Sequence, residues 1–245
     1  ARRQANILSN AGTRLMITFA DVERLAGLLR SQIPTLTAVT TLDELAPPIN
    51  DHTVSLERPP VSLTSADPAL IQYTSGSTGH PKGVLLTHAN LLANIRAIRD
   101  GLDIQPGDVA VSWLPLYHDM GLIGMMLAPL VWGCSGVFIP TLTFVKHPTI
   151  WLETVSKFKG TTTFAPNFAY AIAVRRTSAK KLAKLDLSSL RIVGCGAEPN
   201  HPETLNKFVE HFAQAGLKPE AMLPVYGMAE ATLAMSFSRL QDPMR

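Results

Sequence analysis

The residues with the clearest chemical potential form one short loop rich in hydroxyl groups and glycine. Six consecutive positions hold only threonine, serine or glycine, and a basic tripeptide follows soon after: Thr74, Ser75, Gly76, Ser77, Thr78 and Gly79, then Pro81, Lys82 and Gly83. Glycine permits positive φ and close approach of a ligand, and successive N–H groups in such turns form an anion-binding nest. With the mobile charge of Lys82, the pattern favours a cradle for phosphate oxygens.

Two alternatives stand beside this interpretation. The loop differs from the nucleotide-binding pattern G-x-x-x-x-G-K-[ST], because Lys82 follows Pro81 and precedes Gly83. A flexible Ser/Gly linker is therefore one alternative, and a solvated surface lysine is the alternative for Lys82. The linker is disfavoured because the run leads straight into the apolar residues 84–86.

Strand and helix patterns alternate on both sides of the loop and would have to position it. Strands are predicted at 15–19, 37–40, 108–114, 137–139, 161–164, 190–193 and 222–225, and helices at 21–29, 88–100, 147–158 and 201–215. This alternation predicts an α/β fold of βαβ units, with largely parallel sheets covered by helices. Five prolines in residues 46–68 suggest a linker that separates a lead-in segment, 1–65, from a core, 66–245.

Ligands of parallel α/β sheets bind beyond the carboxyl ends of the strands. Three segments with chemical potential directly follow predicted strands: the phosphate loop, residues 194–199 and residues 226–230. We therefore expect a ligand site at one edge of the sheet.

Composition narrows the class of protein. The chain has 245 residues, 46% hydrophobic and 17% charged, which indicates a globular core. Its net charge is only +3 and its basic residues are scattered in sequence, so no nucleic-acid partner is expected. The apolar run 120–137 is interrupted by four glycines and a proline, so we expect a buried helix and a strand there, with no transmembrane segment.

Two cysteines, Cys134 and Cys195, provide neither a disulfide framework nor metal-ligand spacing. A reduced, cytoplasmic location is the default expectation. The chain starts without methionine, and it stops soon after residue 232. We therefore expect a piece of a longer polypeptide.

Several motifs, in this order, resemble those of the adenylate-forming superfamily, which includes acyl-CoA synthetases, luciferases and peptide-synthetase adenylation domains. The phosphate loop is similar to the signature of that superfamily. Residues 114–124 (LPLYHDMGLIG) and 226–232 (YGMAEAT) look most like the fatty acyl-AMP ligase branch, and residues 166–170 (PNFAY) and 196–199 (GAEP) are weaker matches. The resemblance covers nearly the whole chain and implies a fragment of the large N-terminal domain.

The resemblance implies an activity and its residues. A long-chain fatty acid would be activated with ATP and Mg²⁺ to acyl-adenylate, with release of pyrophosphate, and the acyl group would pass to the thiol of an acyl carrier protein, with coenzyme A as the alternative acceptor. Lys82 and the phosphate loop would hold the phosphates, Glu230 would be the magnesium ligand, and His118 would lie between the nucleotide and acyl sites. These three are the implied catalytic residues. The implied adenine and nucleotide contacts are Gly196, Ala197, Glu198, Pro199, Tyr226, Gly227, Met228, Ala229 and Thr232.

Structural alternatives remain open for the individual residues. Glu230 could be a glutamate in the first turn of a helix, favoured by the dipole. Tyr226 could be a core aromatic residue, and His118 a structural histidine. Many superfamily members carry threonine where this chain has Ala229, so the hydroxyl group that would bind the α-phosphate is absent at that position. Thr232 lies one turn further on and is assigned only a possible role in phosphate binding. Seven residues are candidates for the wall of an acyl tunnel: Met120, Met125, Met126, Leu127, Asn167, Phe168 and Tyr170. For most of them, ordinary packing in the hydrophobic core is the favoured interpretation.

Two rival functions follow. One is an acyl-CoA synthetase with coenzyme A as the acceptor, and the other is a non-catalytic adenylate-binding or interaction module. By resemblance, a small C-terminal domain with a catalytic lysine would follow Arg245. We therefore expect the isolated chain to be weakly active or inactive.

Overall fold

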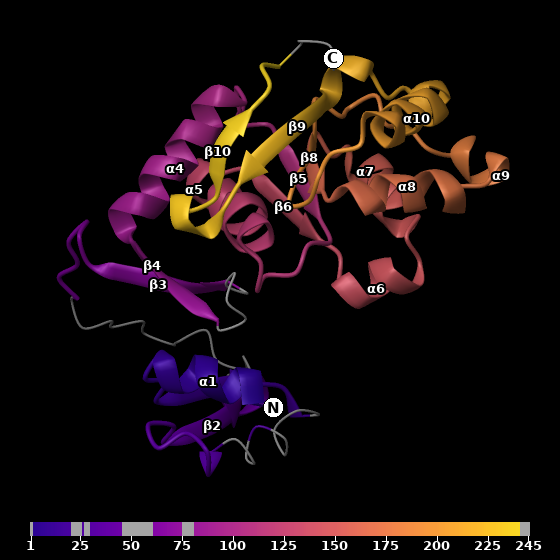
Figure 1. Ribbon diagram of the computed structural model, residues 1–245. Helices are drawn as coiled ribbons and strands as arrows, with labels where there is room; N and C mark the ends of the chain where they lie inside the picture. Colours follow the sequence, from indigo (N-terminus) through magenta and orange to yellow (C-terminus); the bar gives the residue numbers. More distant parts are fainter. Residues whose placement is uncertain (1, 21–25, 27–29, 46–60, 75–80, 241–245) are drawn as a thin grey trace, which may run out of the picture. The chain divides into compact units, whose positions relative to one another are not determined.

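The strands and helices alternate along the chain as the sequence pattern predicts (Figure 1). The computed structural model describes residues 2–20, 26, 30–45, 61–74 and 81–240. Two compact units divide the chain, Ala1–His88 and Ala89–Arg245, and each is described by itself. The division into 1–65 and 66–245, drawn from the proline-rich stretch, stays a proposal about domains.

The first unit combines a parallel strand pair with a hairpin. Strands β1 (Leu15–Thr18) and β2 (Ala38–Thr41) pair in parallel, and β3 (Pro68–Thr74) and β4 (Lys82–Thr87) pair antiparallel. Helices α1 (Arg2–Asn10) and α3 (Leu42–Leu45) belong to this unit. Ala5, Ile33 and Leu36 form its small core. The predicted helix 21–29 lies, except for Ala26, outside the described residues.

The second unit contains a six-stranded sheet. Its spatial order is β10 (Ala234–Phe237), β9 (Met222–Gly227), β8 (Ile192–Cys195), β7 (Thr162–Ala165), β5 (Val109–Ser112) and β6 (Ser135–Phe138). Strand β10 runs antiparallel to β9, and the other neighbours pair in parallel. The predicted α/β class, with a largely parallel sheet, is confirmed.

Helices cover both faces of this sheet (Figure 1). They are α4 (His88–Gly101), η1 (Met120–Leu127, a π-helix), α5 (Ala128–Trp132), α6 (Thr141–Lys146), α7 (Ile150–Phe158), α8 (Asn167–Arg176), α9 (Ala179–Leu182) and α10 (Pro202–Phe212), with short 3₁₀ turns η2 (Ala213–Ala215), η3 (Pro219–Ala221) and η4 (Ala229–Ala231). The apolar run 120–137 is thus a helical segment and a strand, as expected.

Side-chain alternation along β8 assigns the two faces. Ile192 packs with Ile98 and Leu102 from α4 and the segment after it. The next residue, Val193, packs in the larger cluster that contains Trp151 of α7 and Phe208 of α10. Since successive side chains of a strand point to opposite faces, the two clusters lie on opposite sides of the sheet. Each hydrophobic cluster therefore packs against one face of the sheet, and together the two clusters position the strands and their ends.

Buried polar contacts anchor the larger core. The Trp151 indole N–H donates to the Thr163 hydroxyl at 2.8 Å, and this hydroxyl donates to the carbonyl of Val111 at 2.8 Å. A buried indole needs such a partner, because an unpaired donor in the core costs about 1–3 kcal/mol. The contacts join α7 to β7 and β5. In the part of the chain that the structure describes, no helix is long and apolar enough to span a membrane.

Candidate functional site

The carboxyl ends of four parallel strands meet at one edge of the large sheet. Ala165 pairs with Cys195, and Cys195 pairs with Pro224, so β7, β8 and β9 end side by side. Strand β5 joins β7 through Ala110 and Thr162. Each of these four strands runs into a segment that the sequence analysis selected. This edge is where parallel α/β sheets bind ligands.

The segment after β5 presents His118 in a tight turn. The His118 N–H donates to the carbonyl of Pro115 at 3.2 Å, and the next helical residues begin at Asp119. Asp119 caps this helix, because its carboxylate accepts the N–H of Met120 at 2.7 Å. Gly121 is required here, since a Cβ would lie 2.3 Å from the Pro115 carbonyl oxygen. The turn therefore holds the exposed imidazole of His118 on the rim of the sheet edge.

His118 has two alternative hydrogen-bond states. Its Nδ1 lies 2.8 Å from the Asp119 carboxylate and 3.2 Å from the Met120 nitrogen. A protonated Nδ1 donates to Asp119, and a neutral imidazole with a free Nδ1 accepts from Met120. The hydrogen bond to Asp119 raises the pKa of His118 above its usual value, and partial burial of the ring opposes this shift. The Nδ1 atom of His118 can therefore act as a donor when the ring is protonated or as an acceptor when it is neutral.

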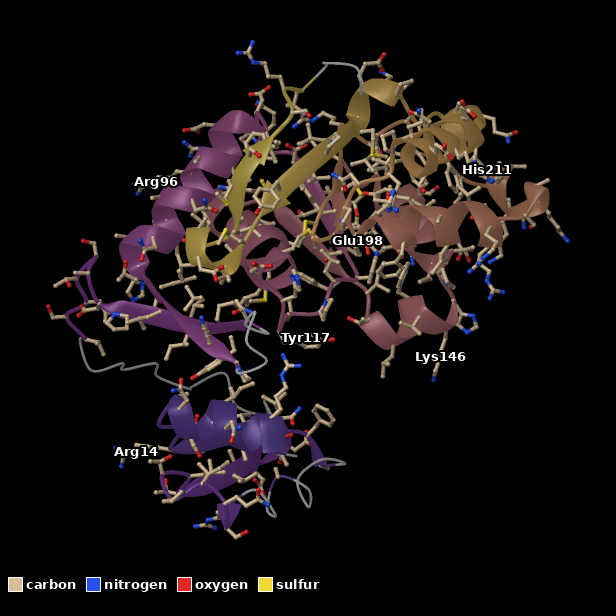
Figure 2. The ribbon with its side chains drawn as sticks, in the orientation of Figure 1. Arg14, Arg96, Tyr117, Lys146, Glu198 and His211 are labelled. Atoms are coloured by element: carbon tan, nitrogen blue, oxygen red, sulfur yellow. The ribbon has the colours of Figure 1, made fainter. Side chains whose placement is uncertain are left out.

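The segments after β7 and β8 are locked together. The Glu198 carboxylate accepts the N–H of Phe168 at 2.7 Å, and the Asn167 side-chain oxygen accepts the N–H of His201 at 3.0 Å. Ala197 has a φ of +68°, an uncommon conformation for a residue with a side chain. Through the hydrogen bond to Phe168, Glu198 provides a partner for a backbone N–H in the first turn of α8, a contact that the sequence did not predict. Figure 2 labels Glu198 together with Tyr117 from the segment after β5.

Strand β9 delivers the third segment through a tight reversal into β10. Tyr226 lies inside β9, beyond the predicted end of the strand, and is 60% exposed, so the core-aromatic alternative is wrong. The N–H of Met228 donates to the carbonyl of Leu233 at 2.9 Å and closes the turn. Pro199 follows Glu198 on the neighbouring loop after β8. Exposed Tyr226 is thus available to a flat ligand at the sheet edge.

Glu230 and Thr232 differ sharply in their surroundings. Glu230 is exposed on the 3₁₀ turn η4 and not in a longer helix, and within the described part of the chain it makes no hydrogen bond or ion pair. Thr232 is buried, with φ +74° and ψ −60°, a strained conformation for a β-branched residue. Ala229 is also buried. The turn therefore presents one exposed carboxylate, Glu230, two residues before the strained Thr232.

A magnesium ion fits this carboxylate. Mg²⁺ is usually held by one or two carboxylates together with phosphate oxygens and water, so a dedicated protein cage is not needed. Among the described residues, no group of three or more histidine, cysteine or acidic side chains is placed to hold a metal. Glu230 would hold the ion with the phosphates of a nucleotide, whose negative charge the ion would neutralise.

The phosphate loop belongs to the first unit and closes the β3–β4 hairpin. Its ends, Thr74 and Lys82, are directly opposite each other in the antiparallel register. Ser75, Gly76, Ser77, Thr78 and Gly79 lie outside the described residues. The strands on either side of this loop pair antiparallel, as a short connection between consecutive strands allows. Lys82 is exposed, so its ammonium group is accessible to a ligand.

Two features of the site edge escaped sequence reasoning. The Asn94 side chain of α4 donates to the carbonyl of Ala234 at 2.9 Å and accepts its N–H at 3.0 Å, so it anchors β10. Its only signal was a polar residue within the apolar stripe of α4. Trp113, directly after β5, stacks on Phe144 with ring centroids 3.6 Å apart and meets the half-exposed Phe168 edge-on. No spacing rule identifies these contacts.

The candidates for an acyl tunnel divide into core and rim. Met120, Met125 and Tyr170 are buried in the large cluster, and the Tyr170 hydroxyl donates to the Gly194 carbonyl at 2.6 Å. Asn167 is buried as well, whereas Met126, Leu127 and Phe168 are partly or well exposed. The preference for core packing is confirmed for the first group. Phe168 stays the best-placed candidate for contact with an acyl chain.

Comparison with known proteins agrees with this arrangement. A profile of the AMP-binding enzyme family matches residues 1–245. The medium-chain-fatty-acid–[acyl-carrier-protein] ligase TtuA of Teredinibacter turnerae is 44% identical over 178 residues, 72% of this chain and 28% of that protein. The long-chain-fatty-acid–AMP ligase FadD26 of Mycobacterium marinum is 44% identical over 170 residues, 67% of this chain and 29% of that protein.

Solved structures give the same result. A fatty acyl-adenylate ligase from L. pneumophila, in complex with acyl adenylate and pyrophosphate, has a TM-score of 0.84 and 34% identity over 98% of this chain and 41% of that chain. This chain spans less than a third of the length of the curated relatives above, 28% and 29%. Since the family profile matches every residue, the chain belongs to the AMP-binding enzyme family.

Proposed function

We propose that this chain is the nucleotide- and acyl-binding part of a fatty acyl-AMP ligase. The whole enzyme would activate a long-chain fatty acid with ATP and Mg²⁺, release pyrophosphate, and transfer the acyl group to the thiol of a carrier protein. The observation that carries this proposal is that the segments with His118, Glu198 and Tyr226 come from the carboxyl ends of β5, β8 and β9, parallel strands of one sheet. The similarity to a solved ligase that holds acyl adenylate and pyrophosphate supports it.

The chemistry requires positioning and positive charge. A carboxylate oxygen of the fatty acid forms a bond to the α-phosphorus of ATP, and the bond from that phosphorus to the β-phosphate bridging oxygen breaks. Two anions must approach each other, so electrostatic stabilisation of the phosphates dominates the catalysis. Lys82 would contribute a positive charge to the leaving pyrophosphate. Bound Mg²⁺ would neutralise phosphate charge, held through Glu230.

His118 and Tyr226 would place the other reactants. A protonated His118, stabilised by Asp119 at 2.8 Å, would attract the fatty-acid carboxylate and orient it toward the α-phosphorus. The exposed ring of Tyr226 would stack on adenine, with the backbone of residues 196–199 along the edge of the base. Holding both reactants in line can supply several kcal/mol of the rate enhancement.

Acceptor and location are parts of the same proposal. The name of TtuA specifies an acyl carrier protein as the acceptor, and this favours a carrier-protein thiol over coenzyme A. The second rival, a non-catalytic module, is disfavoured because Glu230 and Lys82 are both accessible. A cytoplasmic location is supported by the two free thiols, Cys134 and Cys195.

Product analysis of the full-length protein tests the proposal. With ATP, Mg²⁺ and a series of fatty acids, we expect pyrophosphate and acyl-AMP, and acyl transfer to a carrier protein with little acyl-CoA. Formation of acyl-CoA as the main product would overturn the carrier-protein assignment. Absence of pyrophosphate release with every fatty acid, from a folded sample that binds ATP, would support the non-catalytic module.

A further inference from the structure

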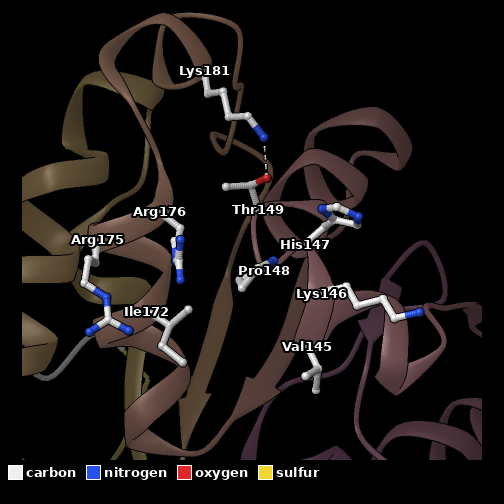
Figure 3. Close-up of a pocket in the computed structure, with 9 residues that line it drawn as sticks. All are labelled: Val145, Lys146, His147, Pro148, Thr149, Ile172, Arg175, Arg176 and Lys181. Carbon is white, nitrogen blue, oxygen red and sulfur yellow. Dashed lines mark hydrogen bonds between the residues drawn. The ribbon is translucent and has the colours of Figure 1, made fainter.

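A groove in the second unit gathers positive charges that lie apart in the sequence. Its hollow measures about 290 Å³ and lies between the end of α6 and the segment after it on one side and α8 and α9 on the other (Figure 3). Lys146 comes from the first side, next to His147, and Arg175, Arg176 and Lys181 come from the second. The volume is at the lower end of the range for small-molecule sites.

The side chains that line the groove carry more positive than negative charge. Lys146, Arg175, Arg176 and Lys181 contribute four positive charges, and Glu153, the ion-pair partner of Lys181, contributes one negative charge. The local sum, four positive charges minus one negative, is +3. A cleft lined by charges of one sign attracts ligands of the opposite sign, so this lining favours an anion.

One cation of the groove is held in place by neighbouring side chains. The Lys181 ammonium donates to the hydroxyl of buried Thr149 at 2.6 Å and to the Glu153 carboxylate at 3.0 Å. An ammonium group has three donors, so one remains for a ligand. Within the described residues, Arg175 and Arg176 form no ion pair. Their planar guanidinium groups match the geometry of phosphate oxygens.

Helix dipoles explain only part of this arrangement. Lys146 lies in the last turn of α6, and Arg175 and Arg176 lie in the last turn of α8, where basic side chains offset the partial negative charge. The carboxyl end of a helix carries a partial charge of only about −0.5, so the two positive charges of Arg175 and Arg176 are more than is required to offset it. The groove also contains the apolar side chains of Val145 and Ile172. This mixture suits a small organic anion better than a bare ion.

We propose that this groove binds a phosphate monoester, with the phosphate between the arginines and Lys181 and the organic part on Val145 and Ile172. The monoester could be a free metabolite or the headgroup of a lipid, because both present the same dianion. The groove lies wholly within residues 145–181 and uses none of the residues assigned to adenylation.

Calorimetric titration with glycerol 3-phosphate tests the proposal. The full-length protein carries Lys82→Ala as a background, so that the phosphate loop contributes little to the signal. Arg175→Gln/Arg176→Gln should weaken binding at least tenfold. Lys207→Gln/Lys218→Gln, which removes two exposed charges elsewhere in the same unit, is the matched control and should leave affinity unchanged. Lys146→Gln is a second groove variant in case the double variant melts early.

Vesicles distinguish the two sources of the phosphate. Retention on phosphatidic acid vesicles but not on phosphatidylcholine vesicles, without binding of glycerol 3-phosphate, would assign the groove to a lipid headgroup. Binding of glycerol 3-phosphate would assign it to a free ester. Either result supports the proposal only if Arg175→Gln/Arg176→Gln weakens binding to that probe and Lys207→Gln/Lys218→Gln does not. Equal affinity in the two variants, or no binding to either probe, would overturn it.

Discussion

Gly227 is the residue at which one added methyl group should disable the site. A Cβ at this position would lie 1.9 Å from the carbonyl oxygen of Leu233, which is a backbone atom and cannot rotate away. Ordinary contact begins at 3.4 Å, so the backbone would have to move by about 1.5 Å. The same oxygen accepts the N–H of Met228 at 2.9 Å, so this movement would also open the turn.

Gly227→Ala should therefore affect both activity and stability. A displacement of about 1 Å at a reacting centre can cost about a hundredfold in rate, and Tyr226 and Glu230 lie on either side of the disturbed backbone. Overpacking typically costs about 1–3 kcal/mol, which corresponds to a melting temperature lower by about 2–12 °C for a unit of this size. We expect at least a hundredfold slower fatty-acid-dependent ATP–pyrophosphate exchange by the full-length protein.

Gly107→Ala is the matched control, because a Cβ there has nothing within 4 Å. It should keep exchange activity within about twofold of the unmodified protein, since surface substitutions away from special features cost at most about 0.5 kcal/mol. Normal activity and an unchanged melting temperature in Gly227→Ala would refute the steric argument. A lower melting temperature with normal activity would show that the turn does not position the reactants.

Three further predictions follow from single side chains. Lys82→Ala should weaken ATP use tenfold to a hundredfold, because a hydrogen bond to a charged group contributes about 1.5–3 kcal/mol; unchanged ATP kinetics would remove its assigned role. Asp119→Asn should lower the pKa of His118, measured by NMR titration, because the Asp119 hydrogen bond is the main cause that raises it above 6.5. In the unmodified protein, the contribution of the His118–Asp119 pair to stability should be complete below pH 6.5 and should be lost as the pH rises through the raised pKa of His118. The same NMR titration curve in Asp119→Asn and in the unmodified protein would contradict this assignment. Cys195 should resist alkylation until the protein unfolds, because burial raises its pKa to about 12 and leaves the thiol inaccessible; labelling of native Cys195 at the rate of partly exposed Cys134 would be the opposite result.

The β9–β10 turn holds Thr232 in a strained backbone conformation. Its φ of +74° persists because the β9–β10 reversal is fixed from two sides, by the Met228–Leu233 hydrogen bond and by Asn94 on Ala234. Strain of this kind costs of order 1–3 kcal/mol and persists only where the surroundings over-determine the backbone. The backbone of η4, which carries Glu230, is therefore part of a turn held at both of these points, although the Glu230 side chain forms no hydrogen bond or ion pair with the described residues.

The sequence alone determined the elements and the order of the site segments. Apolar spacing located α4, α7 and α10 to within a few residues, because helix periodicity is a local property. The strands before residues 194–199 and 226–230 were found in the same way. The phosphate loop stays a prediction from composition, in which glycine would permit close backbone approach to an anion and the serine and threonine hydroxyls would add hydrogen-bond donors.

Only the tertiary structure decided which of these segments meet. The capping of Phe168 by Glu198 and the anchoring of Ala234 by Asn94 join residues 30 and 140 positions apart. Their polar atoms carry no local signal of a distant partner. The basic groove arose in the same way, from Lys146, Arg175 and Lys181, whose charges are separated in sequence. Local periodicity fixes helices and strands, but contacts between distant side chains depend on how the layers pack around the sheet.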